Sequence, residues 1–392
     1  MPPLRTALDV FAWSRTAIWG TMLLAYAVFE AQYAQPLHPP TAAPEPPADV
    51  GWGVDVWARW DGGWFTHIAE DGYTDPKTTT AFFPAYPLLV RVAGWAFGGH
   101  DVLAGVVVSL LAAAAAFVLL LELAQRLVGG DAARRSLVYL AVSPAALFLG
   151  AVYSESLYLL FAVAAFLLAE RRAYAYAGAA SGLAILTRPT GVMLVPALAL
   201  LAWRERNRIR ALGGVALALP IAAAWPLWLW AAFGHPLAFL DAERNAWHRH
   251  LSAAGPLGGA WKGIVAGWNG LVQYVAGGNR FPGADDPLQA AGINLESLAA
   301  AVFIVALGAV AWRMLGAAYG VFVLASVALP LASPAANFPL LSMPRFTLGV
   351  FPVFIALGAV VTGRRANAIV LAVFGMLLGL DLARWVEWQF VA

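Results

Sequence analysis

The residues best suited to chemistry are gathered in one stretch, Trp57 to Pro87, with the sequence WARWDGGWFTHIAEDGYTDPKTTTAFFPAYP. The stretch holds four carboxylates, one histidine, one lysine and a cluster of aromatic side chains. Because the rest of the chain is mostly apolar, this concentration of polar groups makes it the first candidate for an active site. Carboxylate and imidazole groups serve in such sites as general bases or metal ligands.

Asp61 is the leading candidate for a general base. Trp60, Trp64 and Ile68 recur every four residues, which predicts an amphipathic helix lying in the membrane interface with its aromatic residues at headgroup depth. Asp61 would begin that helix. It could act there as an N-cap that accepts a backbone hydrogen bond, or as a base at the mouth of a cavity. The spacing leaves both roles open.

His67 and Asp71 lie four residues apart on the same helical face, with Glu70 adjacent. That spacing could seat a divalent cation, but a pair without further ligands is a weak metal signal. Hydrogen bonding to an acceptor, or within the loop, is the alternative. We therefore expect no required metal or other cofactor, with a divalent metal as the alternative.

The motif FFPAYP follows, and its two prolines set among aromatic residues predict a rigid turn into the membrane surface. The aromatic residues of this motif, Phe82, Phe83 and Tyr86, are interpreted as the wall of a groove for a lipid tail.

Further charged residues are expected at short turns close to the hydrocarbon boundary. Glu155 follows a very short linker, where an acid is costly unless it is paired. Arg188 in LTRPTG and Arg345 in SMPRF occupy two other such turns. Each arginine could extend to lipid headgroups, but the two together beside helix breaks also suit a phosphate, which guanidinium binds in a bidentate manner.

The segment Phe239 to His250, FLDAERNAWHRH, carries acidic, basic and aromatic residues, including His248. It is interpreted either as a solvated amphipathic loop or as part of a substrate-binding surface.

The elements that must position these residues are membrane helices. Of 392 residues, 61% are hydrophobic and only 12% are charged, far from the composition of a soluble domain. The net charge of +2 is too small to indicate nucleic-acid binding. The absence of cysteine excludes disulfides, thiolate metal sites and cysteine nucleophiles.

Apolar runs long enough to cross a bilayer predict about eleven spans in one integral-membrane domain over residues 1–392. Two long polar segments interrupt them, at residues 30–101 and 234–294. The predicted spans are Val10–Phe29, Val102–Leu123, Ser136–Ala151, Ser156–Ala169, Ala173–Leu186, Gly191–Trp203, one within Ala211–Phe233, Leu295–Trp312, Gly316–Leu331, Thr347–Val361 and Ala366–Leu382.

Arginine positions predict the orientation. With these spans, the arginine-rich turns fall on one side, which the positive-inside rule makes cytoplasmic. The N-terminus is then cytoplasmic, and both polar segments are extracytoplasmic. The turns contain Arg126, Arg134 and Arg135; Arg171 and Arg172; Arg204, Arg206, Arg208 and Arg210; Arg313; and Arg364 and Arg365.

Several motifs together resemble the bacterial relatives of GPI mannosyltransferase II, the PIG-V family of integral-membrane glycosyltransferases. They are RWDGGWFTHIAEDGY, FFPAYPLLVR, SPAALFLGAVYSESLYLLF, GLAILTRPTG, AERNAWHR and SMPRF, in the same order as in the family. The resemblance implies a GT-C fold: an all-α polytopic membrane protein with a long first extracytoplasmic loop that carries interfacial helices. It also implies a polyprenyl-phosphate sugar donor and a bacterial cytoplasmic-membrane location.

Carried onto this chain, the resemblance implies that Asp61 is the catalytic base. It also implies that the helix Trp60–Tyr73 forms part of the active-site wall. The predicted donor-phosphate residues are Arg345, Arg188 and His248. The predicted acceptor or wall residues are Trp60, Trp64, His67, Glu70, Asp71, Tyr73 and Glu155.

The predicted activity is inverting transfer of a hexose, expected to be mannose, from a polyprenyl-phosphate donor to a glycan, glycolipid or protein acceptor. The alternatives are a lipid-linked-sugar flippase or secondary transporter, and a non-catalytic partner subunit. A transporter would more naturally place its charges near the bilayer midplane, whereas the carboxylates here cluster in an outer loop.

Overall fold

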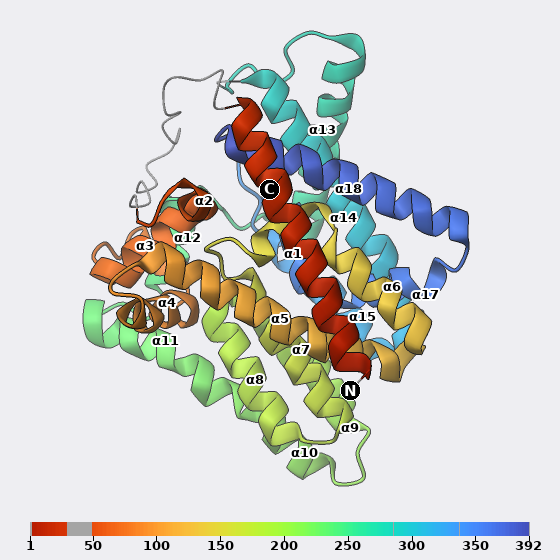
Figure 1. Ribbon diagram of the computed structural model, residues 1–392. Helices are drawn as coiled ribbons and strands as arrows, with labels where there is room; N and C mark the ends of the chain where they lie inside the picture. Colours follow the sequence, from red (N-terminus) through yellow and green to blue (C-terminus); the bar gives the residue numbers. More distant parts are fainter. Residues whose placement is uncertain (1, 30–48, 285, 337, 392) are drawn as a thin grey trace.

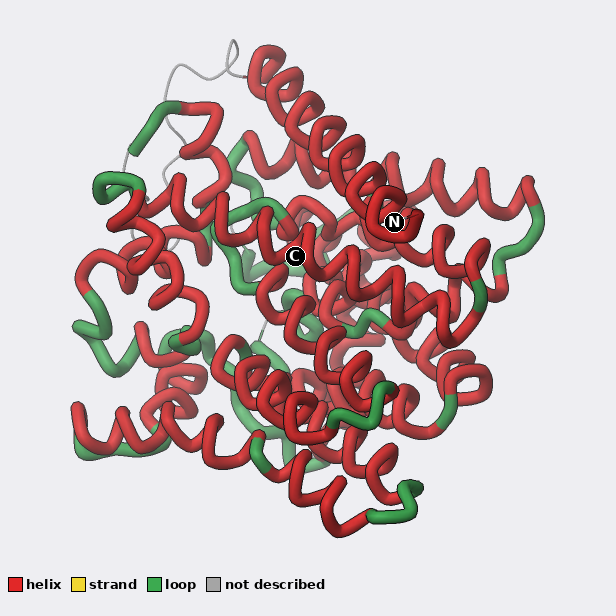
Figure 2. The backbone as a smooth tube through the Cα atoms, turned by 60° about the horizontal axis from the view of Figure 1, so that its bottom comes forward, coloured by secondary structure: helices red, strands yellow, loops and turns green. Residues whose placement is uncertain are grey.

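The computed structural model describes residues 2–29, 49–284, 286–336 and 338–391. Within these residues the regular structure is helical, with one isolated β-bridge between Arg249 and Ala335. Figure 2 shows helices joined by loops, with no strand in the described part of the chain. The predicted all-α class is therefore confirmed. Residues 30–48, which open the first predicted extracytoplasmic segment, lie outside the described residues.

The first half of the chain forms a packed group in which α5 contacts α1, α4, α6 and α7, and α7 contacts α8 (Figure 1). Its α-helices are α1 (Pro2–Phe29), α2 (Trp52–Asp55), α3 (Asp61–Asp71), α4 (Ala85–Ala96), α5 (Asp101–Val128), α6 (Gly130–Ala141), α7 (Glu155–Glu170), α8 (Tyr174–Thr187) and α9 (Leu194–Trp203). Short 3₁₀ helices interrupt this series at Val56–Ala58, Thr79–Ala81, Pro144–Leu149 and Pro189–Met193.

The second half packs against this group through α10, α15, α16, α17 and α18, while α11 lies along α8. Its α-helices are α10 (Arg208–Ala216), α11 (Ala218–Phe233), α12 (Ala238–Asn245), α13 (Gly255–Ala276), α14 (Pro287–Leu315), α15 (Ala317–Ala332), α16 (Met343–Gly349), α17 (Pro352–Val360) and α18 (Arg364–Val386).

Long apolar helices make this a multi-pass membrane protein, but the eleven predicted spans are not confirmed. Among the described residues, 4 helical stretches are long and apolar enough to cross a bilayer: α5, Arg208–Phe233, α14 and α18. The pair α16 and α17, bent by 84°, would be a fifth. Several predicted spans between residues 130 and 203 are too short for this test, since α7, the longest helix there, has 16 residues and a straight span needs about 20.

Helix α13 lies inside the polar segment at residues 234–294, for which the sequence analysis predicts no span. The structure shows 22 helical residues, with Gly259, Gly263 and Gly267 buried along one face. A β-carbon at Gly263 would lie 2.4 Å from Cγ of Leu340, and one at Gly259 would lie 1.9 Å from the carbonyl oxygen of Leu331. Glycines at every fourth position therefore allow neighbouring segments to pack closely against α13. This spacing can be recognised in the sequence.

The stretch that precedes α3 is anchored to the C-terminal end of α18. Nη1 of Arg59 donates to the carbonyl oxygens of Trp385 and Val386 at 2.5 and 2.6 Å. Nε1 of Trp385 in turn donates to the carbonyl oxygen of Val56 at 2.7 Å. The bond to Val386 pairs a carbonyl in the last turn of α18, and the Trp385 carbonyl oxygen also accepts from the Trp388 N–H at 3.2 Å. Segments more than 300 residues apart thus meet at the residues that lead into Asp61.

Candidate active site

Asp61 is the first residue of α3, and its backbone is held by Tyr153. The Asp61 N–H donates to the Tyr153 hydroxyl at 3.1 Å, and that hydroxyl donates to the Arg59 carbonyl oxygen at 3.1 Å. Trp60, between them, has φ 56°, a conformation that costs free energy in a bulky residue and needs support from its surroundings. Tyr153 is buried and supplies that support.

The Asp61 carboxylate does not cap the helix. The N-cap position of α3 is Trp60, and no side chain makes a capping hydrogen bond there. Instead Oδ2 of Asp61 lies 2.5 Å from Nη1 of Arg345 in α16. The N-cap interpretation is therefore wrong, while the role of base is neither confirmed nor excluded by this geometry.

Arg345 joins Asp61 to a second carboxylate. Its Nε lies 3.0 Å from Oε1 of Glu155, at the start of α7. The guanidinium lies over the rings of Tyr153 and Phe148, 5.4 and 5.8 Å from their centroids. Stacking on these aromatic faces, together with the carboxylates, holds the planar cation in one orientation.

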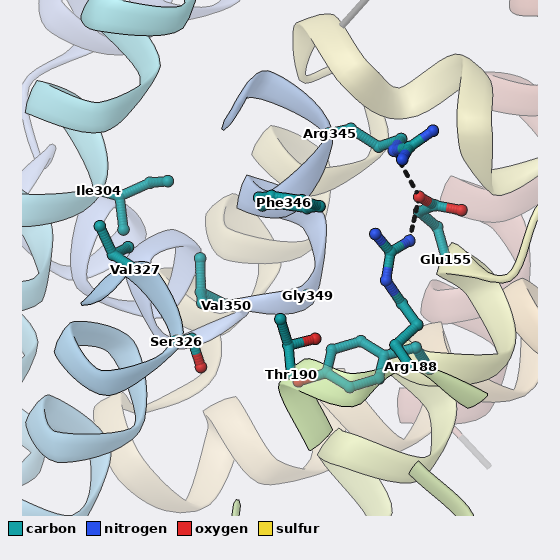
Figure 3. A pocket seen from close by; sticks show the side chains of 11 residues that line it. Glu155, Arg188, Thr190, Ile304, Ser326, Val327, Arg345, Phe346, Gly349 and Val350 are labelled. Atoms are coloured by element: carbon teal, nitrogen blue, oxygen red, sulfur yellow. Dashed lines mark hydrogen bonds and ion pairs between the residues drawn. The ribbon is translucent and has the colours of Figure 1, made fainter. Parts of the chain in front are cut away.

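Arg188 completes this line of charges. Its Nη1 is paired with Oε1 of Glu155, which also contacts Arg345, as Figure 3 shows. Glu155 is 3% exposed, so its charge depends on these two arginines. A cavity of about 20 Å³, room for roughly one water molecule, lies beside the three side chains. We call Asp61, Arg345, Glu155 and Arg188 the charge cluster.

The charge cluster is electrically balanced, with two carboxylates and two guanidinium groups. Its four members come from four separate parts of the chain, and sequence analysis named all of them. Exposure rises from Glu155, at 3%, to the Asp61 side chain, at 27%. The cluster therefore runs from the interior to an accessible carboxylate.

A second ion pair, between Glu243 and Arg249, faces the charge cluster. Nε of Arg249 lies 3.6 Å from Oε2 of Glu243, and its Nη2 donates to the Leu341 carbonyl oxygen at 3.3 Å. Desolvation raises the pKa of Glu243, and the Arg249 charge partly offsets this effect. Desolvation likewise lowers the pKa of Arg249. The charges of Asp61 and Arg345 also act on both groups, which places the pair beside the cluster.

His248, predicted to bind phosphate, is exposed and has φ 51°. Its phosphate-binding role stays a prediction. In this segment, the neighbouring Arg249 is the residue that indicates an inward-facing position, because a guanidinium can donate to several buried carbonyl and carboxylate oxygens at once.

Aromatic side chains line the accessible side of α3. Trp64 stacks on Phe82 at 5.9 Å between centroids and lies 6.2 Å from Trp247. The Tyr73 hydroxyl donates to the Phe82 carbonyl oxygen at 2.9 Å, which holds the chain after α3 in place. Trp60 packs edge-on against Phe390 at 5.4 Å. The predicted wall residues therefore lie together around α3.

The residues of the predicted lipid groove are covered. Tyr86 is completely buried, and its hydroxyl contacts Ser109 of α5 at 2.8 Å. Phe82 and Phe83 are also buried, the latter between Trp225 and Phe239. Contact with a lipid tail stays a prediction, and it requires the covering side chains to move.

His67 is engaged within its own segment. Its Nδ1 lies 3.0 Å from Oδ2 of Asp71, and its Nε2 lies 3.4 Å from Oγ1 of Thr74. Glu70 is exposed. In the part of the chain that the structure describes, no three His, Asp or Glu side chains gather as a metal site. The metal requirement is untested by this arrangement.

Comparison with known proteins gives one family match. Residues 14–194 match the family described as mannosyltransferase (PIG-V). This region contains Asp61, Glu155 and Arg188, whereas Arg345 and the Glu243–Arg249 pair lie beyond it. The match agrees with the predicted mannosyltransferase type over this part of the chain. No curated protein sequence matches the chain at a significant level.

Two solved structures have a similar arrangement of helices. The Archaeoglobus fulgidus oligosaccharyltransferase, solved with Zn and sulfate, is 14% identical, with 93% of this chain and 53% of that chain covered and a TM-score of 0.42. The archaeal oligosaccharyltransferase AglB from Archaeoglobus fulgidus, solved with an inhibitory peptide and a dolichol-phosphate, is 14% identical, with coverage of 94% and 56% and a TM-score of 0.41. The chain thus spans about half the length of both.

The charge cluster makes a prediction about stability. Glu155→Gln should destabilise the protein by about 3–5 kcal/mol, because it leaves Arg188 and Arg345 short of their shared buried counter-charge. Thermal unfolding of the purified protein in detergent measures this loss. The double variant Glu155→Gln with Arg188→Gln should recover part of it.

The matched control is Glu122→Gln, which removes a surface carboxylate paired with Arg126 and Arg171 and should cost no more than about 1 kcal/mol. Equal losses for Glu155→Gln and Glu122→Gln would contradict the buried-pair account.

Proposed function

We propose that this chain, which matches the PIG-V mannosyltransferase family over residues 14–194, transfers mannose from a polyprenyl-phosphate donor to an acceptor hydroxyl, with inversion at the anomeric carbon. The observation that carries the proposal is the contact between Asp61 and Arg345 at 2.5 Å. It places an accessible carboxylate, free of helix capping, directly beside a guanidinium that can bind phosphate.

In the proposed binding step, Arg345 and Arg188 hold the donor phosphate. Both arginines are already paired with carboxylates, so an incoming anion must compete for them. Asp61 is the partner best able to yield, because its side chain is 27% exposed whereas Glu155 is 3% exposed. Donor binding would therefore release Asp61 from Arg345 and direct its carboxylate toward the acceptor.

In the proposed chemical step, Asp61 takes the proton of the acceptor hydroxyl as that oxygen forms a bond to the anomeric carbon. The bond from this carbon to the phosphate oxygen breaks, and its electron pair stays on the polyprenyl phosphate. Attack and departure on opposite faces invert the configuration without a covalent sugar intermediate.

In the proposed chemical step, the charge of Asp61 and the charge of the leaving phosphate change by equal amounts in opposite directions. Asp61 loses its negative charge when it accepts the proton, at the moment when the leaving phosphate gains one. Arg345 can then act fully on the phosphate. Fixed cations in a site with little water stabilise such developing charge strongly.

For the cellular arrangement, we propose that the N-terminus is cytoplasmic and that the charge cluster faces the opposite side. The arginine distribution supports this orientation. The donor lipid would enter laterally from the outer leaflet.

The orientation can be tested with single cysteines, because the native chain has none. A maleimide that does not cross membranes should label Lys77→Cys on intact cells and leave Arg206→Cys unlabelled, since both positions are exposed but are expected on opposite sides. The reverse pattern would contradict the orientation.

The role of Asp61 is tested by transfer of labelled mannose from polyprenyl-phosphate mannose, using purified protein in vesicles with an extract of membrane glycolipids as acceptor. Asp61→Asn should lower the transfer rate by about 10²–10⁴-fold, because the amide cannot accept the proton. The matched control is Asp75→Asn, another carboxylate of the same segment. Its Oδ1 accepts from the Lys77 N–H and its Oδ2 from the Thr78 hydroxyl; an amide oxygen can keep the first bond, and the amide N–H can donate to the Thr78 hydroxyl in place of the second.

Transfer by Asp61→Asn at the unmodified rate would overturn the assignment of the base. Movement of the donor across the vesicle membrane without any covalent product in the unmodified protein would indicate a flippase instead.

A further inference from the structure

A second, larger opening lies outside the charge cluster. It is a cleft of about 490 Å³ between α13, the loop that leads to α14, and the segment before α16. This volume falls within the range of about 300–1,000 Å³ that is typical of sites for small ligands. The predicted functions assigned no role to this part of the chain.

The cleft carries a positive charge. Lys262 and Arg280 line it, and no acidic side chain is among its described lining residues. Neither cation forms an ion pair with a described residue. The nearby carboxylate of Asp286 caps α14 by accepting from the N–H groups of Leu288 and Gln289 at 2.9 and 3.1 Å. Two cations that form no ion pair with the described residues, in one concave surface, favour an anionic ligand.

The loop that bears Arg280 is held by a buried side chain. Gln273 of α13 is 3% exposed. Its Nε2 donates to the Pro287 carbonyl oxygen at 2.7 Å, and its Oε1 accepts from the Arg280 N–H at 2.8 Å. Because one glutamine bonds both ends of the loop, the position of Arg280 is set before any ligand binds, which lowers the entropic cost of binding.

Aromatic and amide groups accompany the cations. Trp261, Phe281 and Phe338 line the cleft, and Asn269 contributes an amide. The Trp261 side chain is largely exposed, at 67%. Aromatic faces can pack against the apolar face of a sugar ring, and an amide can bond its hydroxyls. This combination fits a phosphorylated sugar better than an inorganic ion alone.

The cleft is joined to the charge cluster through one short segment. Phe338 and Pro339 line the cleft, Leu340 packs on Gly263 of α13, and the Leu341 carbonyl oxygen accepts from Arg249. Arg345 follows on the same segment. A ligand seated in the cleft would therefore bind next to the segment that carries the proposed phosphate-binding arginine.

We propose that this cleft binds the phosphorylated sugar head of the acceptor, with Lys262 and Arg280 on the phosphate. The role of acceptor site rests on the proposed transferase function, whereas the binding of a phosphorylated sugar does not. The phosphate can be carried by a lipid or by a soluble sugar phosphate, and the test separates these sources.

The test uses the absence of native cysteine. Ala266→Cys places one thiol in the cleft, and Ala284→Cys is a second position there. The control is Ala253→Cys, an exposed position before α13. The rate of maleimide labelling is measured with mannose 6-phosphate, with mannose, and in nanodiscs of phosphatidylcholine with or without phosphatidylinositol, a lipid whose phosphate carries a polyhydroxylated ring.

We expect mannose 6-phosphate or phosphatidylinositol to slow labelling in the cleft at least fivefold, while mannose has no effect and Ala253→Cys is unaffected. Protection by the soluble probe alone identifies a free sugar phosphate, and protection by the lipid alone identifies a lipid headgroup. Adding Lys262→Gln and Arg280→Gln should raise the half-protecting concentration about tenfold or more, since each charged hydrogen bond contributes on that scale.

The matched charge control is Arg91→Gln, which removes an exposed cation of α4 and should leave protection unchanged. Absence of protection by both probes at both cleft cysteines, or full protection after loss of both cations, would overturn the proposal. Labelling needs no sugar transfer, so the two proposals can fail separately. A protein that is protected but transfers no sugar would reject the transferase function and support the ligand site in the cleft. A protein that transfers sugar but is not protected would support the transferase function and reject the ligand site.

Discussion

The balance of buried charge in the cluster is the constraint on which the rest of the site depends. Glu155 is almost fully buried and shares its carboxylate between Arg188 and Arg345, and Arg345 extends the balance to Asp61. Buried charges are tolerated only when they are paired. Entry of the proposed anionic donor would therefore require a compensating change, and the exposed end of the cluster, Asp61, is where that change would cost least. In the proposed mechanism, the same balance links proton uptake by Asp61 to departure of the phosphate.

The surrounding structure holds this balance in place. Arg59 and Trp385 join the residues before α3 to the end of α18, and Tyr153 bonds the backbone on both sides of Trp60. Tyr153 also lies under the guanidinium of Arg345, so one side chain touches both the proposed base and its partner. Hydrogen bonds that join residues far apart in sequence around one site are suited to holding catalytic groups in fixed positions.

Residue chemistry allowed the cluster members to be predicted. An acid or arginine at a short apolar turn, as at Glu155, Arg188 and Arg345, is costly without a partner, and Asp61 begins the predicted interfacial helix. Their pairing was not predictable, since it depends on how α3, α7 and α16 pack. The same limit applies to His248: spacing shows that a charged segment exists, but not which of two neighbours, His248 or Arg249, faces inward. The eleven predicted spans are not confirmed, because several apolar helices, such as α8, are shorter than a straight crossing needs. Helix α13 lies inside the predicted polar segment 234–294, and glycines at every fourth position are the sequence feature that indicates its close packing.

The central claim is that Asp61 and the donor phosphate compete for Arg345, and the most direct measurement is the affinity of purified protein for polyprenyl-phosphate mannose. Asp61→Asn gives the charge cluster one net positive charge, so the account predicts donor binding about tenfold tighter than in the unmodified protein, a change of roughly 1.4 kcal/mol. Arg345→Gln should weaken binding in both backgrounds. Weaker or unchanged donor binding by Asp61→Asn would contradict the account.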